Sequence, residues 1–365
     1  MKIPYVNLNK QWNTEKKSLL KIIDQVASKN LWVGGGEVQK FEKKISKICK
    51  TKYAVALNSG TDALTLGLFS LGIKRGDEVI TTSNSFIAST ATIVHIGAVP
   101  VFVDVLDNQL IDHTKIEDKI TKKTKAIMLV HLGGRIANID YIKKISKKYK
   151  IPIIEDAAQS IGSKYRNKPA GSIGEIGCFS AHPLKNLNAL GDSGYVTTNN
   201  EIIYKTVKSL SNHGHKNRDI VERFGHVSRM DTIQAAILNY RLKNLNKNIL
   251  KRRKNAELYR KYIKTKKVFI TTEDSNVYNT YHTFVIQVDR RDQLKKFLYK
   301  KGIFTSIHYP IPIHLQPATK KLKIKTGNLK MTEIQSKKII TLPVNQFLSE
   351  KEIKYISKMI NIFYG

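Results

Sequence analysis

Lys185 and Asp156 have residue types and sequence settings that suit amine chemistry. Lys185 lies between an apolar segment and a Gly-rich turn, within SAHPLKNLNALGDSG at 180–194, and Asp156 ends the apolar run at 151–156. A lysine amine can form a Schiff base with an aldehyde. A carboxylate can keep a pyridine nitrogen protonated and make the ring an electron sink. The pair predicts a site for pyridoxal 5′-phosphate (PLP). The alternative, an ordinary surface lysine, fits the sequence around Lys185 poorly.

Two further segments carry groups that can bind the phosphate of PLP. At 58–64, the small-residue sequence NSGTDAL runs into a predicted helix. Free backbone N–H groups at a helix N-terminus bind phosphate well. The alternative is an ordinary helix cap made by Ser59 or Thr61. Ser180, five residues before Lys185, can add its hydroxyl.

Phe86 and Gln159 are candidates for contacts with the cofactor ring. Phe86 follows a polar turn and can stack on a flat ring, although a core phenylalanine that opens a helix is the simpler interpretation. Gln159 lies three residues after Asp156 and can donate to the phenolic oxygen of PLP. The alternative for Asp156 is a helix cap, which does not explain the small residues Ala157 and Ala158 beside it.

The segments between these residues alternate between predicted strands and predicted helices. Apolar runs predict strands at 53–57, 78–82, 99–103, 125–130 and 151–156, and helical spacing predicts helices at 10–28, 36–48, 61–71, 86–96 and 139–149. Continuous apolar strands are typical of a parallel sheet that is buried on both faces by helices. Ligands bind such sheets beyond the carboxyl ends of the strands. The candidate residues from Asn58 to Ser180 follow such strand ends, so the fold class is α/β with one shared site.

The C-terminal third has a different pattern and predicts a second, smaller α/β domain. Helices are expected at 200–210, 230–264, 291–301 and 350–361, and strands at 284–288 and 304–307. We therefore expect a large domain over residues 1–249 and a small domain over residues 250–365, joined through the long helix.

Composition limits the classes of function. The chain of 365 residues has no apolar run of eighteen residues and no signal-peptide pattern, so no integral membrane association and a cytoplasmic location are expected. Cys49 and Cys178 are too few for a disulfide framework. The net charge of +34 permits nucleic-acid binding, but the lysines are scattered rather than clustered. No nucleic-acid partner and no metal are expected, because His213 and His215 lack a clear third ligand.

Several motifs together resemble the sugar-nucleotide aminotransferases of the DegT/DnrJ type, which are PLP enzymes with the aspartate-aminotransferase fold (fold type I). The resemblance covers almost the whole chain. It is carried by the Lys185 segment and by the motifs at 58–64, 76–80, 130–132, 155–160, 228–231 with 234–236, and 308–310 with His314.

The resemblance implies a role for each matching residue. Lys185 would be the catalytic lysine that holds the cofactor and moves a proton, with Asp156 at the pyridine nitrogen. The other implied cofactor contacts are Gly60, Thr61, Asp62 (through its backbone), Phe86, Gln159 and Ser180, and the implied substrate contacts are His308, Tyr309 and Arg229. The resemblance also implies a homodimer with shared active sites. Val227 stands where the family often has an asparagine that reaches the partner's phosphate site.

The implied reaction moves an amino group from L-glutamate to a nucleotide-linked keto-sugar. The form of the Lys185 segment resembles enzymes that act on dTDP-linked 3-keto-6-deoxyhexoses, which would place the product in surface-glycan biosynthesis. A 4-keto or a UDP-linked sugar remains open, as does a non-catalytic nucleic-acid-binding or regulatory protein on this fold. Related dehydratases carry histidine at the Lys185 position, so the lysine favours amino transfer.

Overall fold

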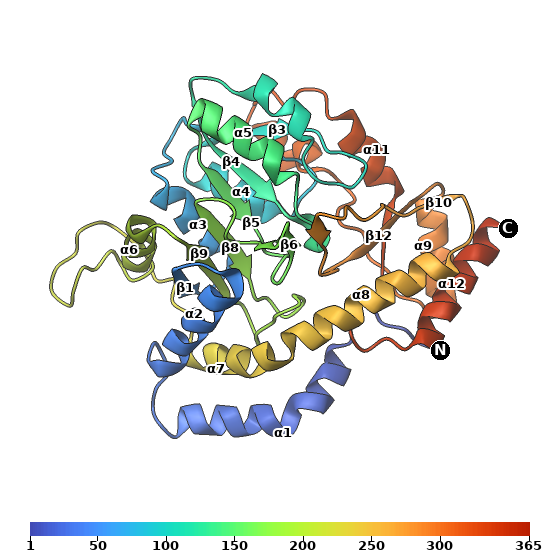
Figure 1. The fold of residues 1–365 in the computed structure, drawn as a ribbon, viewed down its shortest axis with the longest axis horizontal. Helices are drawn as coiled ribbons and strands as arrows, with labels where there is room; N and C mark the ends of the chain where they lie inside the picture. The colour runs from blue at the N-terminus through green and yellow to red at the C-terminus, as the bar shows by residue number, and fades with distance from the viewer.

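A seven-stranded sheet forms the centre of the computed structural model, which describes residues 1–365 (Figure 1). The strand order is β1-β9-β8-β5-β4-β2-β3. The strands are β1 (Tyr53–Leu57), β2 (Glu78–Thr82), β3 (Val99–Val103), β4 (Thr124–Val130), β5 (Ile153–Asp156), β8 (Ile176–Ser180) and β9 (Gly194–Thr198). Pairing is parallel from β3 through β8, whereas β9 is antiparallel to β8 and to β1. The predicted α/β class is confirmed.

Helices cover both faces of this sheet, because alternate residues of its strands enter two different cores. On β4, Ile127 and Leu129 pack in one core with α2 (Gly36–Cys49) and α5 (Ile139–Tyr149). Ala126 and Met128 pack in the other core. The helices on that second face are α3 (Gly60–Ser70), α4 (Ile87–His95) and α6 (Glu201–Leu210).

Helix α8 (Leu245–Tyr262) connects this core to a third one. Its Leu245 and Ile249 pack in the core of the large sheet, and its Ala256 and Tyr259 pack in the C-terminal core. The predicted helix at 230–264 is interrupted by a 3₁₀ turn, Leu242–Asn244, which separates α7 (Thr232–Arg241) from α8. Helix α1 (Leu8–Ala27) lies beside α7 at the bottom of Figure 1.

The C-terminal region is built on a three-stranded antiparallel sheet. Its strands, in spatial order, are β10 (Val268–Phe269), β12 (Phe284–Val288) and β13 (Ile339–Leu342). The helices of this region are α9 (Arg291–Lys300), α10 (Pro317–Lys321), α11 (Lys330–Lys338) and α12 (Glu350–Tyr364). Ile3 also packs in this core, and both chain termini lie beside α12 (Figure 1). The boundary proposed at 249/250 falls within α8.

The prediction of a strand at 304–307 is wrong, because these residues form no strand. Only an isolated bridge joins Ser306 to Thr341, and β13, which was not predicted, pairs with β12 instead. A further small sheet joins β11 (Val277–Tyr278), β6 (Lys164–Tyr165) and β7 (Lys168–Pro169).

None of the helices is both long enough and apolar enough to span a membrane.

Candidate active site

A cavity of about 480 Å³ lies at the carboxyl ends of the central strands and brings most of the predicted residues together. Its walls include ten residues from segments far apart in the sequence, namely Ser59, Gly60, Thr61, Phe86, Asp156, Gln159, Ser180, Lys185, His308 and Tyr309. Of the predicted site residues, only Asp62 and Arg229 lie outside the cavity walls.

The N-terminus of α3 forms one end of the cavity. The Ser59 hydroxyl caps the helix by accepting a 3.0 Å hydrogen bond from the Asp62 N–H. The N–H groups of Gly60 and Thr61 precede the first helical hydrogen bond and have no acceptor in the protein. A Cβ on Gly60 would lie 2.6 Å from Cβ of Ser180, so glycine is what allows the helix to approach β8 so closely. The Asp62 N–H, expected to bind phosphate, is occupied by the cap.

Asp156 is buried at the end of β5 and is held by its neighbours. Its Oδ2 accepts a 2.6 Å hydrogen bond from the Ser89 hydroxyl, and its Oδ1 accepts from the Ala158 N–H at 3.2 Å. Since successive strand residues face opposite sides, the preceding Glu155 points away and pairs with His131 at 3.0 Å. Burial raises the pKa of Glu155, but the His131 contact and backbone N–H groups outweigh it and lower the pKa.

Lys185 lies in a turn after β8, where its N–H donates to the carbonyl of His182 at 2.8 Å. Burial against the cavity wall disfavours the ammonium form and lowers the pKa of Lys185 to about 8, although the Asp156 carboxylate opposes this shift. A lysine with a lowered pKa has a larger fraction of the neutral, nucleophilic amine at neutral pH.

Gln159, Tyr309 and Phe86 form another wall. The Gly133 N–H donates to Oε1 of Gln159 at 2.7 Å, and this bond directs the amide group of Gln159 so that Nε2 donates to the Tyr309 hydroxyl at 3.3 Å. Phe86 is 54% exposed, so its ring is available to a ligand, and the centre of that ring lies 6.1 Å from that of Tyr309. The simpler interpretation, in which Phe86 is a core residue that opens a helix, is therefore wrong.

Arg229 and Val227 are not brought to this cavity. Both lie on the 211–231 loop, which extends after α6 at the left of Figure 1. Arg229 is exposed and donates to Oδ1 of Asn212 at 3.3 Å, while Val227 is 49% exposed. Neither residue lines the cavity of its own protomer.

Tyr5, Arg252 and His282 line the cavity but were not predicted from the sequence. Arg252 donates from Nη1 to the carbonyls of Tyr281 and His282, its Nε has no partner, and no carboxylate pairs with it. Burial lowers the pKa of Arg252 to about 10. The sequence does carry a signal for Arg252. At helical spacing, Arg252 falls on the same buried face of α8 as Leu245, Ile249, Ala256 and Tyr259, where a charged residue is unexpected.

The donors around the cavity fit PLP. Two free N–H groups at a helix N-terminus and the Ser180 hydroxyl match a phosphate, and a buried, hydrogen-bonded carboxylate matches a pyridine nitrogen. An amine on the same cavity, Lys185, matches the aldehyde.

Comparison with known proteins agrees with this chemistry. The model of the DegT/DnrJ/EryC1/StrS aminotransferase family matches residues 13–361. A "pleiotropic regulatory protein" of Geobacillus stearothermophilus is 35% identical (100% of this chain, 99% of the relative). The dTDP-3-amino-3,6-dideoxy-α-D-galactopyranose transaminase of Aneurinibacillus thermoaerophilus is 36% identical (98% and 99%). The UDP-2-acetamido-2-deoxy-3-oxo-D-glucuronate aminotransferase of Pseudomonas aeruginosa is 34% identical (97% and 98%).

Solved structures share the whole fold. The Streptomyces venezuelae enzyme DesV, crystallised in complex with a ketimine intermediate, is 31% identical, with a TM-score of 0.96 over 99% of this chain and 98% of DesV. The Bacillus subtilis protein NtdA with bound cofactor PMP is 30% identical, with a TM-score of 0.92 over 100% of this chain and 86% of NtdA. The predicted fold type I and the predicted PLP dependence are thereby confirmed. This chain belongs to the DegT/DnrJ/EryC1/StrS aminotransferase family and is a PLP-dependent aminotransferase.

Proposed function

We propose that this enzyme transfers an amino group from L-glutamate to a keto-6-deoxyhexose linked to a nucleoside diphosphate. A dTDP-linked 3-keto sugar, which would give a 3-amino sugar for surface glycans, is the first candidate. The observation that carries the proposal is the presence of Lys185 and Asp156 on one cavity, with the free N-terminus of α3 at its end. The names of the Aneurinibacillus and Pseudomonas relatives support a nucleotide-sugar substrate.

PLP, when bound, supplies an electron sink that stabilises negative charge on the substrate carbon. The protein's own groups do the rest. Ser89 fixes the Asp156 carboxylate, which would pair with the ring nitrogen, and the Gly133 N–H fixes the amide of Gln159. The amine of Lys185 would hold and release the proton during the reaction, and its lowered pKa of about 8 suits proton transfer in both directions at neutral pH.

The surroundings of Arg252 indicate that the cavity also binds an anionic group of a substrate. A buried guanidinium that has only neutral carbonyl partners retains an uncompensated charge, which is costly unless a ligand supplies the counter-charge. Arginine binds carboxylates through two parallel hydrogen bonds. We therefore assign Arg252 to a carboxylate of glutamate, while the net charge of +34 attracts the diphosphate of the sugar substrate.

A homodimer with shared active sites is part of the proposal. The loop at 211–231, which carries Arg229, exposes the apolar side chains of Ile220, Val221 and Phe224, the last of them completely. Exposed apolar side chains that gather on one segment mark an interaction surface. A second copy of this chain would cover that surface and bring Arg229 to the site of the partner.

The experiment is to incubate the PLP-loaded protein with glutamate and a panel of keto-sugars, and to read the mass of the products. The panel contains dTDP- and UDP-linked sugars with the keto group at carbon 3 or at carbon 4. The proposal predicts an aminated dTDP-linked 3-keto sugar and an equal amount of 2-oxoglutarate. If a 4-keto or a UDP-linked sugar is aminated instead, the enzyme remains a sugar aminotransferase but the proposed substrate is wrong. DNA retention that depends on salt, with no product, would instead support a regulatory protein.

A further inference from the structure

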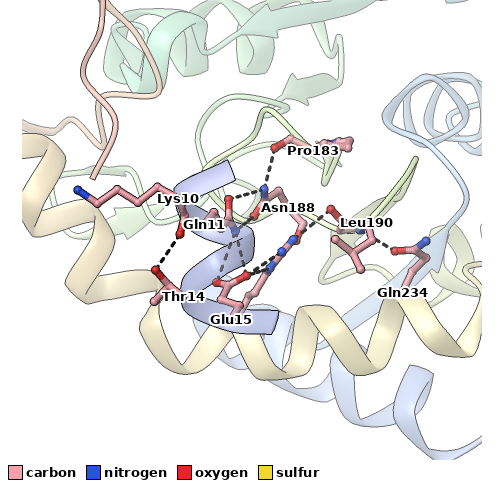
Figure 2. Close-up of polar contacts among 10 residues, drawn as sticks. Lys10, Gln11, Thr14, Glu15, Pro183, Asn188, Leu190 and Gln234 are labelled. Atoms are coloured by element: carbon pink, nitrogen blue, oxygen red, sulfur yellow. Dashed lines mark hydrogen bonds and ion pairs between the residues drawn. The ribbon is translucent and has the colours of Figure 1, made fainter. Parts of the chain in front are cut away.

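The segment 183–190, which carries Lys185, is held from outside by two helices that take no part in the cavity. Gln11 of α1 and Asn188 exchange two amide hydrogen bonds, of 3.1 and 3.2 Å. Asn188 also donates to the carbonyl of Pro183 at 2.7 Å. On α7, Oε1 of Gln234 accepts from the Leu190 N–H at 2.8 Å. Figure 2 shows these contacts on the two sides of the segment.

Arg241 completes this arrangement at the end of α7. Its Nη1 donates to the carbonyls of Asn188 and Ala189, at 2.7 and 3.1 Å. The rest of its guanidinium pairs with Oε2 of Glu15, with Nη2 at 2.8 Å and Nε at 2.9 Å. The side chains of Arg241 and Glu15 are only 6% and 14% exposed. Glu15 also accepts from Nε2 of Gln11, at 3.3 Å, so the contacts form one closed network.

The segment depends on these contacts because it has little regular structure of its own. Residues 181–193 contain no helix or strand. Within 183–190, the only backbone N–H groups that donate to backbone carbonyls are those of Lys185, to His182, and of Ala189, to Ala181. The Leu184 N–H donates to Nδ1 of His182 at 3.3 Å. On the other side, Asn186 donates to the carbonyl of Thr280 at 3.2 Å. A lysine on an irregular segment keeps a fixed position only if the segment is held by its neighbours.

We propose that Arg241 and Glu15, with Gln11 and Asn188, are positioning residues that fix the backbone of Lys185 and so set where its amine meets the cofactor. This inference rests on the proposed role of Lys185. None of the four residues needs to contact the substrate, because each acts through the 183–190 segment. The expected consequence is a loss of catalytic rate, without loss of substrate affinity, when the network is broken.

The test compares Arg241→Met with a matched control, Arg291→Met. Arg291 is also buried, donates to two backbone carbonyls (Ser336 and Ile339, both at 3.1 Å) and contacts a carboxylate, Asp292. It lies in the C-terminal region, away from Lys185. Both variants lose contacts with two backbone carbonyls and one carboxylate, but Arg241→Met leaves Glu15, which is only 14% exposed, without its cationic partner, whereas Asp292 is 73% exposed. The melting temperature should therefore fall further in Arg241→Met, and the comparison relies on quantities local to Lys185. Only Arg241→Met should loosen the segment that carries Lys185.

Two measurements use the apo-protein and are independent of turnover. We expect Arg241→Met to speed amide hydrogen exchange in 183–190 by at least about tenfold, as loss of hydrogen bonds to a charged group implies. We also expect the pH midpoint for acylation of Lys185 to rise from about 8, because release of the segment reduces burial of the amine. Arg291→Met should change neither quantity.

Kinetics of the loaded enzyme complete the test. Arg241→Met should lower kcat by at least about tenfold with an unchanged KM, and Arg241→Lys, which keeps the ion pair with Glu15, should recover part of the loss. If Arg241→Met does not fold, Glu15→Gln should shift the same quantities in the same direction by less. The proposal is overturned if Arg241→Met matches Arg291→Met in exchange, acylation and kcat. Failure of the proposed function would appear separately, as wild-type protein that aminates no sugar.

Discussion

Lys185 and His308 line the same cavity, where burial of the His308 imidazole and, to a smaller extent, the Lys185 ammonium both favour its neutral form. Burial lowers the pKa of His308 to about 4, and the Lys185 ammonium adds to this shift. Nδ1 of His308 lies 2.9 Å from the Thr341 hydroxyl, which fixes the ring. A neutral imidazole beside the cofactor lysine can exchange hydrogen bonds with a sugar hydroxyl without adding positive charge to the site.

The first prediction concerns stability in acid. Because the pKa of His308 is lower in the folded than in the unfolded protein, the unfolded state binds more protons as the pH falls. Stability is therefore lost between about pH 6.5 and pH 4, by up to about 3 kcal/mol for this group. His282, whose pKa burial also lowers, adds to the loss. The free energy of unfolding, measured in urea, should fall less between pH 7 and pH 4.5 in His308→Gln than in the wild type. An equal fall in both proteins would show that the pKa of His308 is not lowered by folding.

The second prediction concerns the Lys185 amine in the apo-protein. Its reaction with an acylating reagent, followed by peptide mass spectrometry, should reach half its maximal rate near pH 8. Asp156→Asn should move this midpoint to lower pH, because the Asp156 carboxylate is the group that favours the ammonium form. A midpoint close to 10.5 in the wild type would show that the amine is solvated rather than buried.

The third prediction separates Arg252 from its neighbour. Arg252→Met should raise the KM for glutamate about 10- to 100-fold, as expected for the loss of about 1.5–3 kcal/mol of charged hydrogen bonding. Arg253→Met is the control, because Arg253 follows Arg252 directly in α8 but does not line the cavity: it donates to the carbonyl of Asn279 and pairs with Glu273. Steady-state kinetics at saturating keto-sugar should show the KM change in the first variant alone. Equal effects would remove Arg252 from the donor site.

The fourth prediction tests the shared active site. Phe224→Asp places a charge on the most exposed apolar residue of the 211–231 loop and should shift the protein from dimer to monomer, with loss of activity. Ile362→Asp, at an exposed position of α12, is the control. Light scattering after size-exclusion chromatography gives the mass of each variant. A wild-type monomer with full activity would contradict the dimer.

The sequence predicted the central sheet best where burial left a clear pattern. The strands at 53–57, 78–82 and 99–103 have the bounds predicted for them, because a parallel strand covered on both faces is a continuous apolar run. The antiparallel direction of β9 has no such signal, because direction depends on pairing between distant segments. The error at 304–307 has a related cause: β13 takes the place beside β12, and the irregular segment that includes 304–307 leads to His308 and Tyr309 at the cavity.

The site was predictable where its residues follow strands directly. Asp156, Ser180 and the 58–61 turn could be placed together from the rule that ligands bind at carboxyl strand ends. Arg252 and Tyr5 reach the cavity from other parts of the fold, so strand order gave no reason to include them. The sequence does not distinguish an N–H that is free for phosphate from one bound by a cap, and the Asp62 N–H donates to the Ser59 hydroxyl.

The most direct test of the account is to locate the cofactor on the chain. The PLP-loaded protein is reduced with borohydride, digested and mapped by mass spectrometry, with Asp156→Asn as a variant that retains every lysine. We expect a pyridoxyl group on Lys185 in both proteins, and only the wild-type protein should aminate a nucleotide keto-sugar at full rate. A pyridoxyl group on any other lysine, or on none, would contradict this expectation.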